Sequence, residues 1–354
     1  MTLKRKRPSD WKKVVGRICL FLLVFAGLET AGGARELIDI FGRKFSIPDI
    51  PQRVYSASPP VTYMLYAIDP TTLVGLNFPV REWEKKYLNK RMQSLPVVGG
   101  WFGQAQTPNL EMVLKTKPDL IVLMRFGGAF ASKMNEEAMK TMPMPVVDVA
   151  LDKLSDYPDA FSFLGRVLGR ERRTRDLVTY ARKTLSEMAA LAGSIPDHGK
   201  VSVYYAEGLD GLSTDCDTSG HAELINVAGG RNVHHCETRD LYGLEAVALE
   251  QVMLYDPDVI LVKEPIFFKT VFSDPRWQQL RAVKEKRVYL IPFQPFNWFD
   301  RPPSFMRLLG SKWLANLLYP KKYPVDIVKE TQDFFRLFLD VDLSPEEAGA
   351  IIRP

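Results

Sequence analysis

Two copies of one short pattern lie far apart in this chain. Residues 110–123 read LEMVLKTKPDLIVL, and residues 249–262 read LEQVMLYDPDVILV. Each copy is typical of a short amphipathic helix, a Pro-Asp turn and an apolar run. Such a run indicates a buried strand of a parallel sheet. A unit that occurs once in each half of a chain predicts two lobes of similar build.

The first 34 residues have the organisation of a secretory signal peptide. A basic cluster at residues 4–7 precedes an apolar run at 18–28, and small residues follow at 31–34. The apolar run is shorter than the roughly 20 residues of a membrane-spanning helix. We therefore expect cleavage near Ala34 and an exported mature protein, with an uncleaved membrane anchor as the alternative.

The charge balance argues against nucleic-acid binding. The whole chain has 47 Lys and Arg against 42 Asp and Glu. Removing the seven basic and two acidic residues of the leader leaves 40 of each sign. A nucleic-acid binder needs a net or local basic surplus, and the mature sequence shows none.

Two cysteines remain after cleavage, Cys216 and Cys236. Disulfides persist in exported proteins, so a bridge is favoured over free thiols and would add about 3 kcal/mol of stability. A metal site that combines these cysteines with His221, His234 or His235 is the alternative. All four histidines lie after residue 196, so a metal bound between two lobes would find histidine ligands in only one of them. We therefore predict no metal site.

Strands alternating with helices predict an α/β fold of two lobes, each a mainly parallel sheet flanked by helices. The expected strands include residues 72–76. The expected divisions are a signal peptide at 1–34, an N-terminal lobe at 35–152, connector helices at 153–196 and a C-terminal lobe at 197–354. The apolar spacing over residues 177–192 predicts one long amphipathic helix that joins the lobes and limits hinge motion.

Ligands of open α/β sheets bind beyond the carboxyl ends of the strands. That rule selects the candidate ligand-binding residues Thr62, Trp101, Phe102, Arg125, Tyr204, Tyr205, Trp298 and Arg301. Aromatic walls with a few cations suit a bulky, partly apolar, anionic ligand. The alternatives are ordinary packing for the aromatic residues and, for Arg301, a structural pairing that holds the turn at residues 302–303.

An enzyme is the lower-ranked alternative. The sequence contains no G-x-S-x-G, G-x-x-x-x-G-K-[ST] or H-E-x-x-H motif. We therefore predict no catalytic residues and no cofactor.

Three features together resemble one protein family. They are IDIFGRKFSIPDIPQRVYS near the N-terminus, the repeat with its connector helix, and FDRPPSFMRLLGSKWLANLLYP near the C-terminus. The family is that of the periplasmic substrate-binding proteins of ABC importers for ferric siderophores, haem and vitamin B12, with a branch that binds molybdate and tungstate. The resemblance implies a periplasmic protein of two lobes that binds a small-molecule metal chelate in the cleft between the lobes and delivers it to an inner-membrane permease. We expect this protein to be a monomer.

The resemblance also implies a role for the repeat. In this family each lobe carries a glutamate that contacts basic residues of the permease, and those positions match Glu111 and Glu250 here. The alternative is that each glutamate only stabilises the first turn of its helix. The aromatic candidates favour a ferric chelate as ligand, while molybdate or tungstate, cobalamin and haem stay open.

Overall fold

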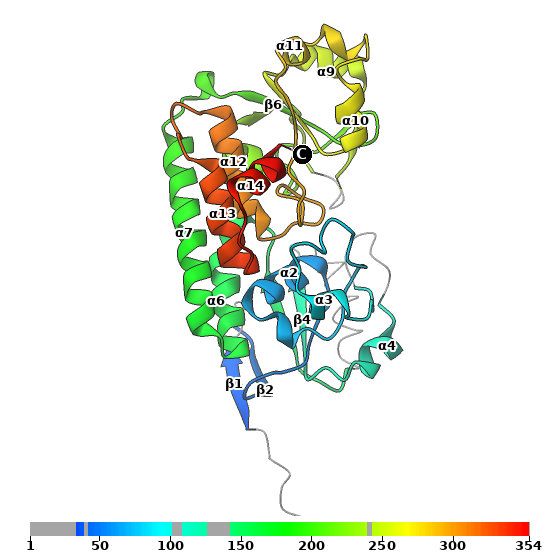
Figure 1. The fold of residues 1–354 in the computed structure, drawn as a ribbon, viewed down its shortest axis with the longest axis vertical. Helices are drawn as coiled ribbons and strands as arrows, with labels where there is room; N and C mark the ends of the chain where they lie inside the picture. The colour runs from blue at the N-terminus through cyan, green and yellow to red at the C-terminus, as the bar shows by residue number, and fades with distance from the viewer. Residues whose placement is uncertain (1–32, 39–41, 101–107, 126–141, 239–242, 354) are drawn as a thin grey trace, which may run out of the picture.

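The protein is described by a computed structural model over residues 33–38, 42–100, 108–125, 142–238 and 243–353. Figure 1 shows two α/β lobes with the long helix α7 (Glu171–Gly193) running along one side of the molecule. Across the described ranges, none of the helices combines the length and apolarity that a bilayer crossing requires. The predicted fold class is confirmed.

The N-terminal lobe is built on a parallel sheet in the order β3-β4-β5. Its strands are β3 (Val54–Ser56), β4 (Leu120–Arg125) and β5 (Val146–Ala150). Helix α4 (Leu110–Lys115) leads into β4, so the first repeat copy folds as helix, turn and strand, as predicted. Residues 72–76, expected to form a full strand, make only isolated parallel bridges, Val54 to Leu73 and Leu76 to Val97.

The C-terminal lobe has a parallel sheet in the order β11-β10-β6-β8. The strands are β6 (Ser202–Ala206), β8 (Arg231–Asn232), β10 (Val259–Val262) and β11 (Val288–Leu290). Helix α9 (Leu249–Tyr255) precedes β10, and all four residues of β10 are buried. The second repeat copy therefore has the same local structure as the first, one copy per sheet.

Two helices connect the lobes. Helix α6 (Tyr157–Leu168) ends at Gly169, whose φ of 63° is in the left-handed region that glycine adopts without a steric cost. Helix α7 then runs from the N-terminal to the C-terminal lobe, and its 23 residues span about 34 Å. The amphipathic pattern explains the packing, because Leu177, Ala181 and Met188 are buried along one face.

Three helices follow at the C-terminus: α12 (Met306–Leu318), α13 (Ile327–Leu339) and α14 (Pro345–Ile352). Helices α12 and α13 pack against α7, and α14 packs on α13. They contribute to one continuous hydrophobic core. This core includes Val122 of the first sheet, Leu261 of the second sheet, Leu177 of α7 and Phe334 of α13. The side chains of Lys86 and Glu347 form an ion pair at 2.8 Å between the N-terminal lobe and α14. Movement between the lobes therefore has to repack a close-packed core.

The remaining elements are short, and α2 among them is almost wholly buried. A hairpin of β1 (Ala34–Ile38) and β2 (Lys44–Pro48) lies at the N-terminus of the described chain. The others are α2 (Pro59–Ile68), α3 (Lys90–Gln93), α8 (Glu223–Val227), α10 (Pro265–Thr270), α11 (Arg281–Lys284), β7 (Ser213–Thr214), β9 (Glu245–Ala246) and 3-10 turns at Pro70–Thr72, Leu154–Asp156, Asp197–Gly199 and Trp277–Gln279.

Candidate ligand site between the lobes

The carboxyl edge of the first sheet meets the C-terminal lobe. Four residues after the end of β5, the backbone N–H of Leu154 donates to Oε2 of Glu223, on α8, over 3.0 Å. After β3, the first turns of α2 place Tyr63 against Phe296, and the two rings stack with centroids 3.9 Å apart. Ligands of open α/β sheets bind beyond the carboxyl ends of the strands, and these ends of β3 and β5 lie at the junction of the lobes.

Ser58 stands at the start of α2, and its side-chain hydroxyl has no hydrogen-bond partner in the structure. It is the N-cap residue, yet its side chain makes no capping hydrogen bond. The residue is 3 % exposed, and its Oγ is buried without a partner. Pro59 and Pro60 occupy the next two positions and have no N–H to cap. A buried hydroxyl without a partner costs about 1–3 kcal/mol, and a hydrogen bond from a water or a ligand at this position would offset that cost.

Thr62 lies one turn further along α2 and belongs to a buried polar network. Its hydroxyl donates to Oδ1 of Asn77 over 2.6 Å. The Nδ2 of Asn77 donates to the carbonyl oxygens of Ser56 and Gly99, both over 2.9 Å. Because this network ties the ends of three chain segments together, it holds Ser58 and Thr62 in place at the edge of the sheet.

A cavity opens beside this network. Its lining includes Thr62, Tyr63 and Asn77 of the N-terminal lobe and Phe296 of the C-terminal lobe. Glu84 also lines it, accepts a hydrogen bond from the backbone N–H of Arg81 over 2.8 Å, and has a pKa raised by burial. Phe296 is the one residue of the C-terminal lobe in this lining, so the cavity belongs mainly to the N-terminal lobe and is closed by the C-terminal lobe on one side.

Across the junction, Arg301 is the centre of a buried charge cluster. Its Nε donates to Oε1 of Glu207 over 2.7 Å, and its Nη2 donates to Oδ2 of Asp215 over 2.6 Å. Oδ2 of Asp300 lies 3.4 Å from Nε. The backbone of Arg301 has φ +54°, an unfavourable value for a non-glycine residue that a surrounding network can hold. The structural pairing that the sequence left open for Arg301 is therefore present.

Two acids of this cluster, Glu207 and Asp300, are buried and have shifted pKa values. Burial and the neighbouring Asp215 raise the pKa of Glu207 to about 8. Burial by itself raises the pKa of Asp300. The nearby His221, whose Nδ1 lies 2.6 Å from Oδ2 of Asp300, outweighs burial, so the net effect is a lowered pKa. One Oε of Glu207 and the hydroxyl of Tyr205 are buried without partners.

Three of the aromatic candidates lie in the protein core. Tyr204, Tyr205 and Trp298 are each 0 % exposed. Strand β6 continues through Ala206, so Tyr204 and Tyr205 point to its two opposite faces, and a separate hydrophobic cluster covers each face. The indole N–H of Trp298 donates to the carbonyl oxygen of Gln294 over 2.9 Å. In this structure these three side chains present no surface to a ligand.

Three other candidates have no described side chain. Trp101 and Phe102 lie outside the described residues. Arg125 ends β4 at the carboxyl edge of the sheet, as the sequence predicts, and only its backbone is described. These three residues stay predictions.

The two glutamates of the repeat occupy the same position in two similar helices. Glu111 is in the first turn of α4, its side chain is 77 % exposed, and Lys115 pairs with it at 2.8 Å. Glu250 is in the first turn of α9 and is exposed. Figure 1 places α4 in the N-terminal lobe and α9 in the C-terminal lobe, both away from α7.

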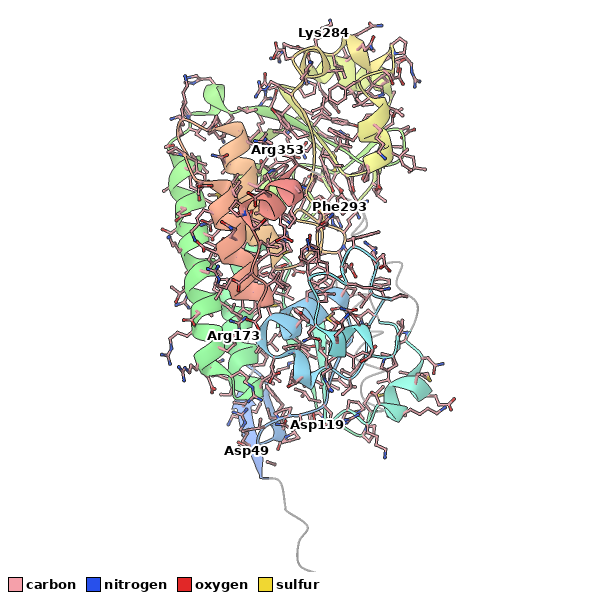
Figure 2. All side chains as sticks on the ribbon, in the orientation of Figure 1. Asp49, Asp119, Arg173, Lys284, Phe293 and Arg353 are labelled. Atoms are coloured by element: carbon pink, nitrogen blue, oxygen red, sulfur yellow. A yellow bond between two sulfur atoms is a disulfide. The ribbon has the colours of Figure 1, made fainter. Side chains whose placement is uncertain are left out.

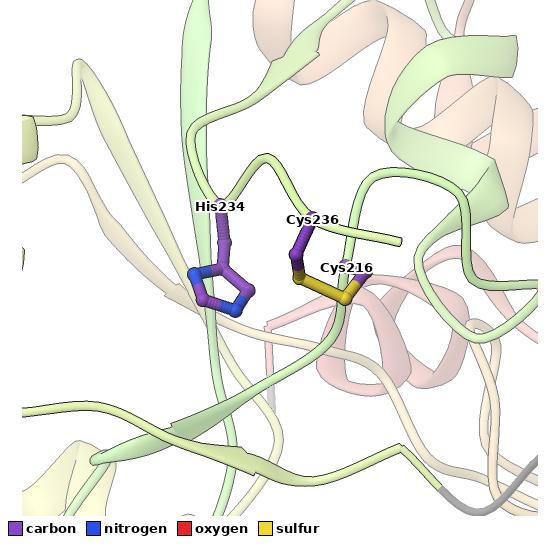
Figure 3. A group of neighbouring side chains, drawn as sticks. All are labelled: Cys216, His234 and Cys236. Carbon is purple, nitrogen blue, oxygen red and sulfur yellow. A yellow bond between two sulfur atoms is a disulfide. The ribbon is translucent and has the colours of Figure 1, made fainter. Parts of the chain in front are cut away.

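The structure joins Cys216 and Cys236 by a disulfide, with the Cα atoms 5.1 Å apart. Figure 3 shows the ring of His234 beside this bond. Among the described residues, Cys216, His234 and Cys236 form the group whose ligand atoms are close enough to hold a metal ion. The disulfide consumes both thiolates, so the two cysteines cannot act as metal ligands. The bridge follows Asp215 directly, so it restrains the loop that carries this partner of Arg301.

Asn77 and Asp215 were missed by the sequence analysis. Asn77 directly follows the apolar residues 72–76, so the rule of strand ends could have selected it. Asp215 follows no recognisable strand pattern, and its partners are 4 to 86 residues away. Nothing local in the sequence indicates that contact.

Comparison with known proteins shows which family this chain belongs to. Residues 54–295 match a family model described as periplasmic binding protein. An ABC transporter solute binding protein from Sulfurospirillum deleyianum is 40 % identical, covers 90 % of this chain and 98 % of its own, and has a TM-score of 0.85. The molybdate-binding protein MolA of Haemophilus influenzae is 24 % identical over 345 residues, covering 89 % of this chain and 93 % of MolA.

A further relative is the ferric enterobactin-binding periplasmic protein FepB of Escherichia coli, 21 % identical over 299 residues, which cover 78 % of this chain and 90 % of FepB. The resemblance stated from the sequence is confirmed, and this chain belongs to the periplasmic binding protein family.

Proposed function

We propose that this protein is an exported, periplasmic substrate-binding protein that delivers a small ligand to the permease of an ABC importer. The two-lobed fold with ligand-facing residues at the junction supports this role, as does the 40 % identity to an ABC transporter solute binding protein. Residues 1–34 then act as a cleaved leader; most of them lie outside the described residues. The protein returns its ligand unchanged and acts as a monomer.

The proposed ligand is a small oxyanion of the molybdate type. The observation that carries this choice is the buried hydroxyl of Ser58, without a partner at the start of α2. A helix N-terminus favours negative charge, and a hydroxyl donates well to an anionic oxygen. The sequence argument for a bulky chelate rested partly on Tyr204, Tyr205 and Trp298, which are in the core. MolA, which matches most of the chain, is a molybdate-binding protein.

A ferric chelate is the second candidate, and one observation favours it. Trp83 is 42 % exposed and meets Phe293 edge to face, with ring centroids 5.9 Å apart. The guanidinium of Arg81 lies 5.3 Å from the Trp83 ring. Figure 2 shows Phe293 where the two lobes meet. An aromatic and cationic group of this kind suits a flat, anionic chelate.

Titration calorimetry of the mature protein separates the two candidates. The panel consists of molybdate, tungstate, sulfate, ferric enterobactin, haem and cobalamin. We expect tight binding of molybdate and tungstate only. In thermal unfolding, molybdate at 100 times its dissociation constant should add about 2.7 kcal/mol of stability. Binding of the ferric chelate with no response to molybdate would reverse the ranking. Mass spectrometry of the released ligand tests the enzyme alternative, because a binding protein leaves it unaltered.

Glu111 and Glu250 are proposed as the contacts to the permease. Their support is geometric: one exposed carboxylate stands in the first turn of an equivalent helix in each lobe. Replacing either with Lys should leave ligand affinity unchanged and lower uptake, because like charges at an interface can cost several kcal/mol. Normal uptake by the double variant at normal abundance would leave the glutamates only their effect on the helices.

A further inference from the structure

Exposed leucines accompany both docking glutamates. Leu254, on α9, is 79 % exposed, and Leu114, on α4, is 42 % exposed. Single exposed leucines are common on protein surfaces. These two differ in that each lies three or four residues after a proposed docking glutamate, where helix geometry places side chains on the same face.

The two helices differ at one matched position. When the repeat copies are aligned, Lys115 of α4 stands where α9 has Leu254. Lys115 pairs with Glu111 at 2.8 Å, so Glu111 has to leave this partner before it can contact another cation. On α9 the same position is apolar, so Glu250 has no such intrahelical competitor. Its leucine neighbour is also the more exposed of the two, since Leu254 is 79 % exposed and Leu114 is 42 % exposed.

On the basis of the proposed transport function, we infer that Leu254 and Leu114 are apolar anchors of the permease contact, and that Glu250 with Leu254 forms the tighter of the two anchors. The complementary socket is a basic side chain beside an apolar pocket on the periplasmic face of the permease. The acid supplies attraction and orientation, and the leucine supplies buried apolar area.

The charges argue against two other occupants. An anionic lipid surface repels the carboxylates of Glu111 and Glu250. In a symmetric contact between two copies of this chain, the same helix of each copy would meet, and the glutamate of one copy would face the same glutamate of the other. A basic protein surface satisfies both the acid and the leucine.

The test measures binding of the full mature protein to its permease complex, reconstituted in nanodiscs of phosphatidylethanolamine and phosphatidylglycerol. The complex is the one whose deletion abolishes uptake of the ligand. Leu254→Ala should weaken binding about tenfold. The matched control is Ile38→Ala, because Ile38 is 55 % exposed on β1, which Figure 1 places at the far end of the molecule from α9.

A gain in affinity provides the second measurement. Lys115→Leu gives α4 the arrangement of α9 and releases Glu111, so binding should tighten by at least about twofold. Added salt should weaken wild-type binding and leave the ratio between wild type and Leu254→Ala unchanged, because that ratio reports apolar contact. Thermal unfolding should be unchanged in all three variants, since the altered side chains are exposed.

The outcomes separate this inference from the function on which it rests. If wild-type protein does not bind the permease nanodiscs, both are overturned. If wild type binds, Glu250→Lys does not, and Leu254→Ala binds as wild type does, only the inference is overturned. If Leu254→Ala loses binding to nanodiscs without the permease to the same extent, Leu254 contacts lipid, and the inference is also overturned.

Discussion

Arg301 donates a hydrogen bond from Nε to Oε1 of Glu207 over 2.7 Å, across 94 residues of sequence. The contact fixes the loop before α12 to the end of β6 in the C-terminal lobe. The other Oε of Glu207 is buried without a partner. The cluster therefore holds an arginine at the junction of the lobes through an acid that is costly to ionise.

The stability of this protein should fall as the pH rises through the titration of Glu207. Burial raises the pKa of Glu207 from 4.5 to about 8, so between these values the folded state binds a proton that the unfolded state has lost. Glu207→Gln should reduce this decline by on the order of 2 kcal/mol. Urea unfolding at several pH values from 5 to 8.5 measures it. Glu36→Gln, on exposed β1, is the control, and an identical decline in both variants would refute the prediction.

Ser58→Ala should weaken ligand binding and leave stability nearly unchanged. The hydroxyl has no partner in the protein, so its removal breaks no internal hydrogen bond. The loss of a hydrogen bond to a charged ligand should cost about 1.5–3 kcal/mol of binding free energy. Calorimetry with molybdate measures this. Ser311→Ala is the matched control, because the buried hydroxyl of Ser311 donates to the carbonyl oxygen of Leu308. That control should lower stability by about 1 kcal/mol and keep ligand affinity.

Removing the disulfide should destabilise the protein and loosen the Arg301 cluster. Cys216 and Cys236 are 20 residues apart, and closing such a loop contributes about 3 kcal/mol by the chain-entropy model. The double variant Cys216→Ser, Cys236→Ser should lose that amount in urea unfolding. Thiol titration of unfolded, unreduced mature protein should find no thiol. Two thiols per chain would show that the bridge does not form.

Lys312→Met should destabilise the packing of α12 against α7 and α13. Lys312 is 2 % exposed, and its Nζ lies 3.1 Å from Glu187 of α7 and 2.8 Å from Glu330 of α13. Removing the cation takes the buried ion-pair partner from both carboxylates, which should cost about 3–5 kcal/mol. Each carboxylate keeps one tyrosine hydrogen bond, Glu187 from Tyr323 and Glu330 from Tyr180. Adding Glu330→Gln should recover part of the loss, and urea unfolding measures both. A single variant as stable as wild type would show that the buried ion pairs contribute nothing net.

The sequence by itself determined the fold class and the position of the repeat. Apolar runs after Pro-Asp turns are local signals, and β4 and β10 form where they indicate strands. The apolar spacing of α7 likewise identifies a helix that buries one face. These features depend on residues close together in the chain, so periodicity is enough to predict them.

Only the tertiary structure decided which strand-end residues face the junction of the lobes. Tyr204 and Tyr205 sit one or two residues before the end of β6, and the sequence does not show that helices and loops cover both faces of that strand. Arg301 meets Glu207 and Asp215 across 94 and 86 residues. Pairings at such separations depend on how the lobes and the C-terminal helices pack, because no local pattern encodes a contact between distant loops.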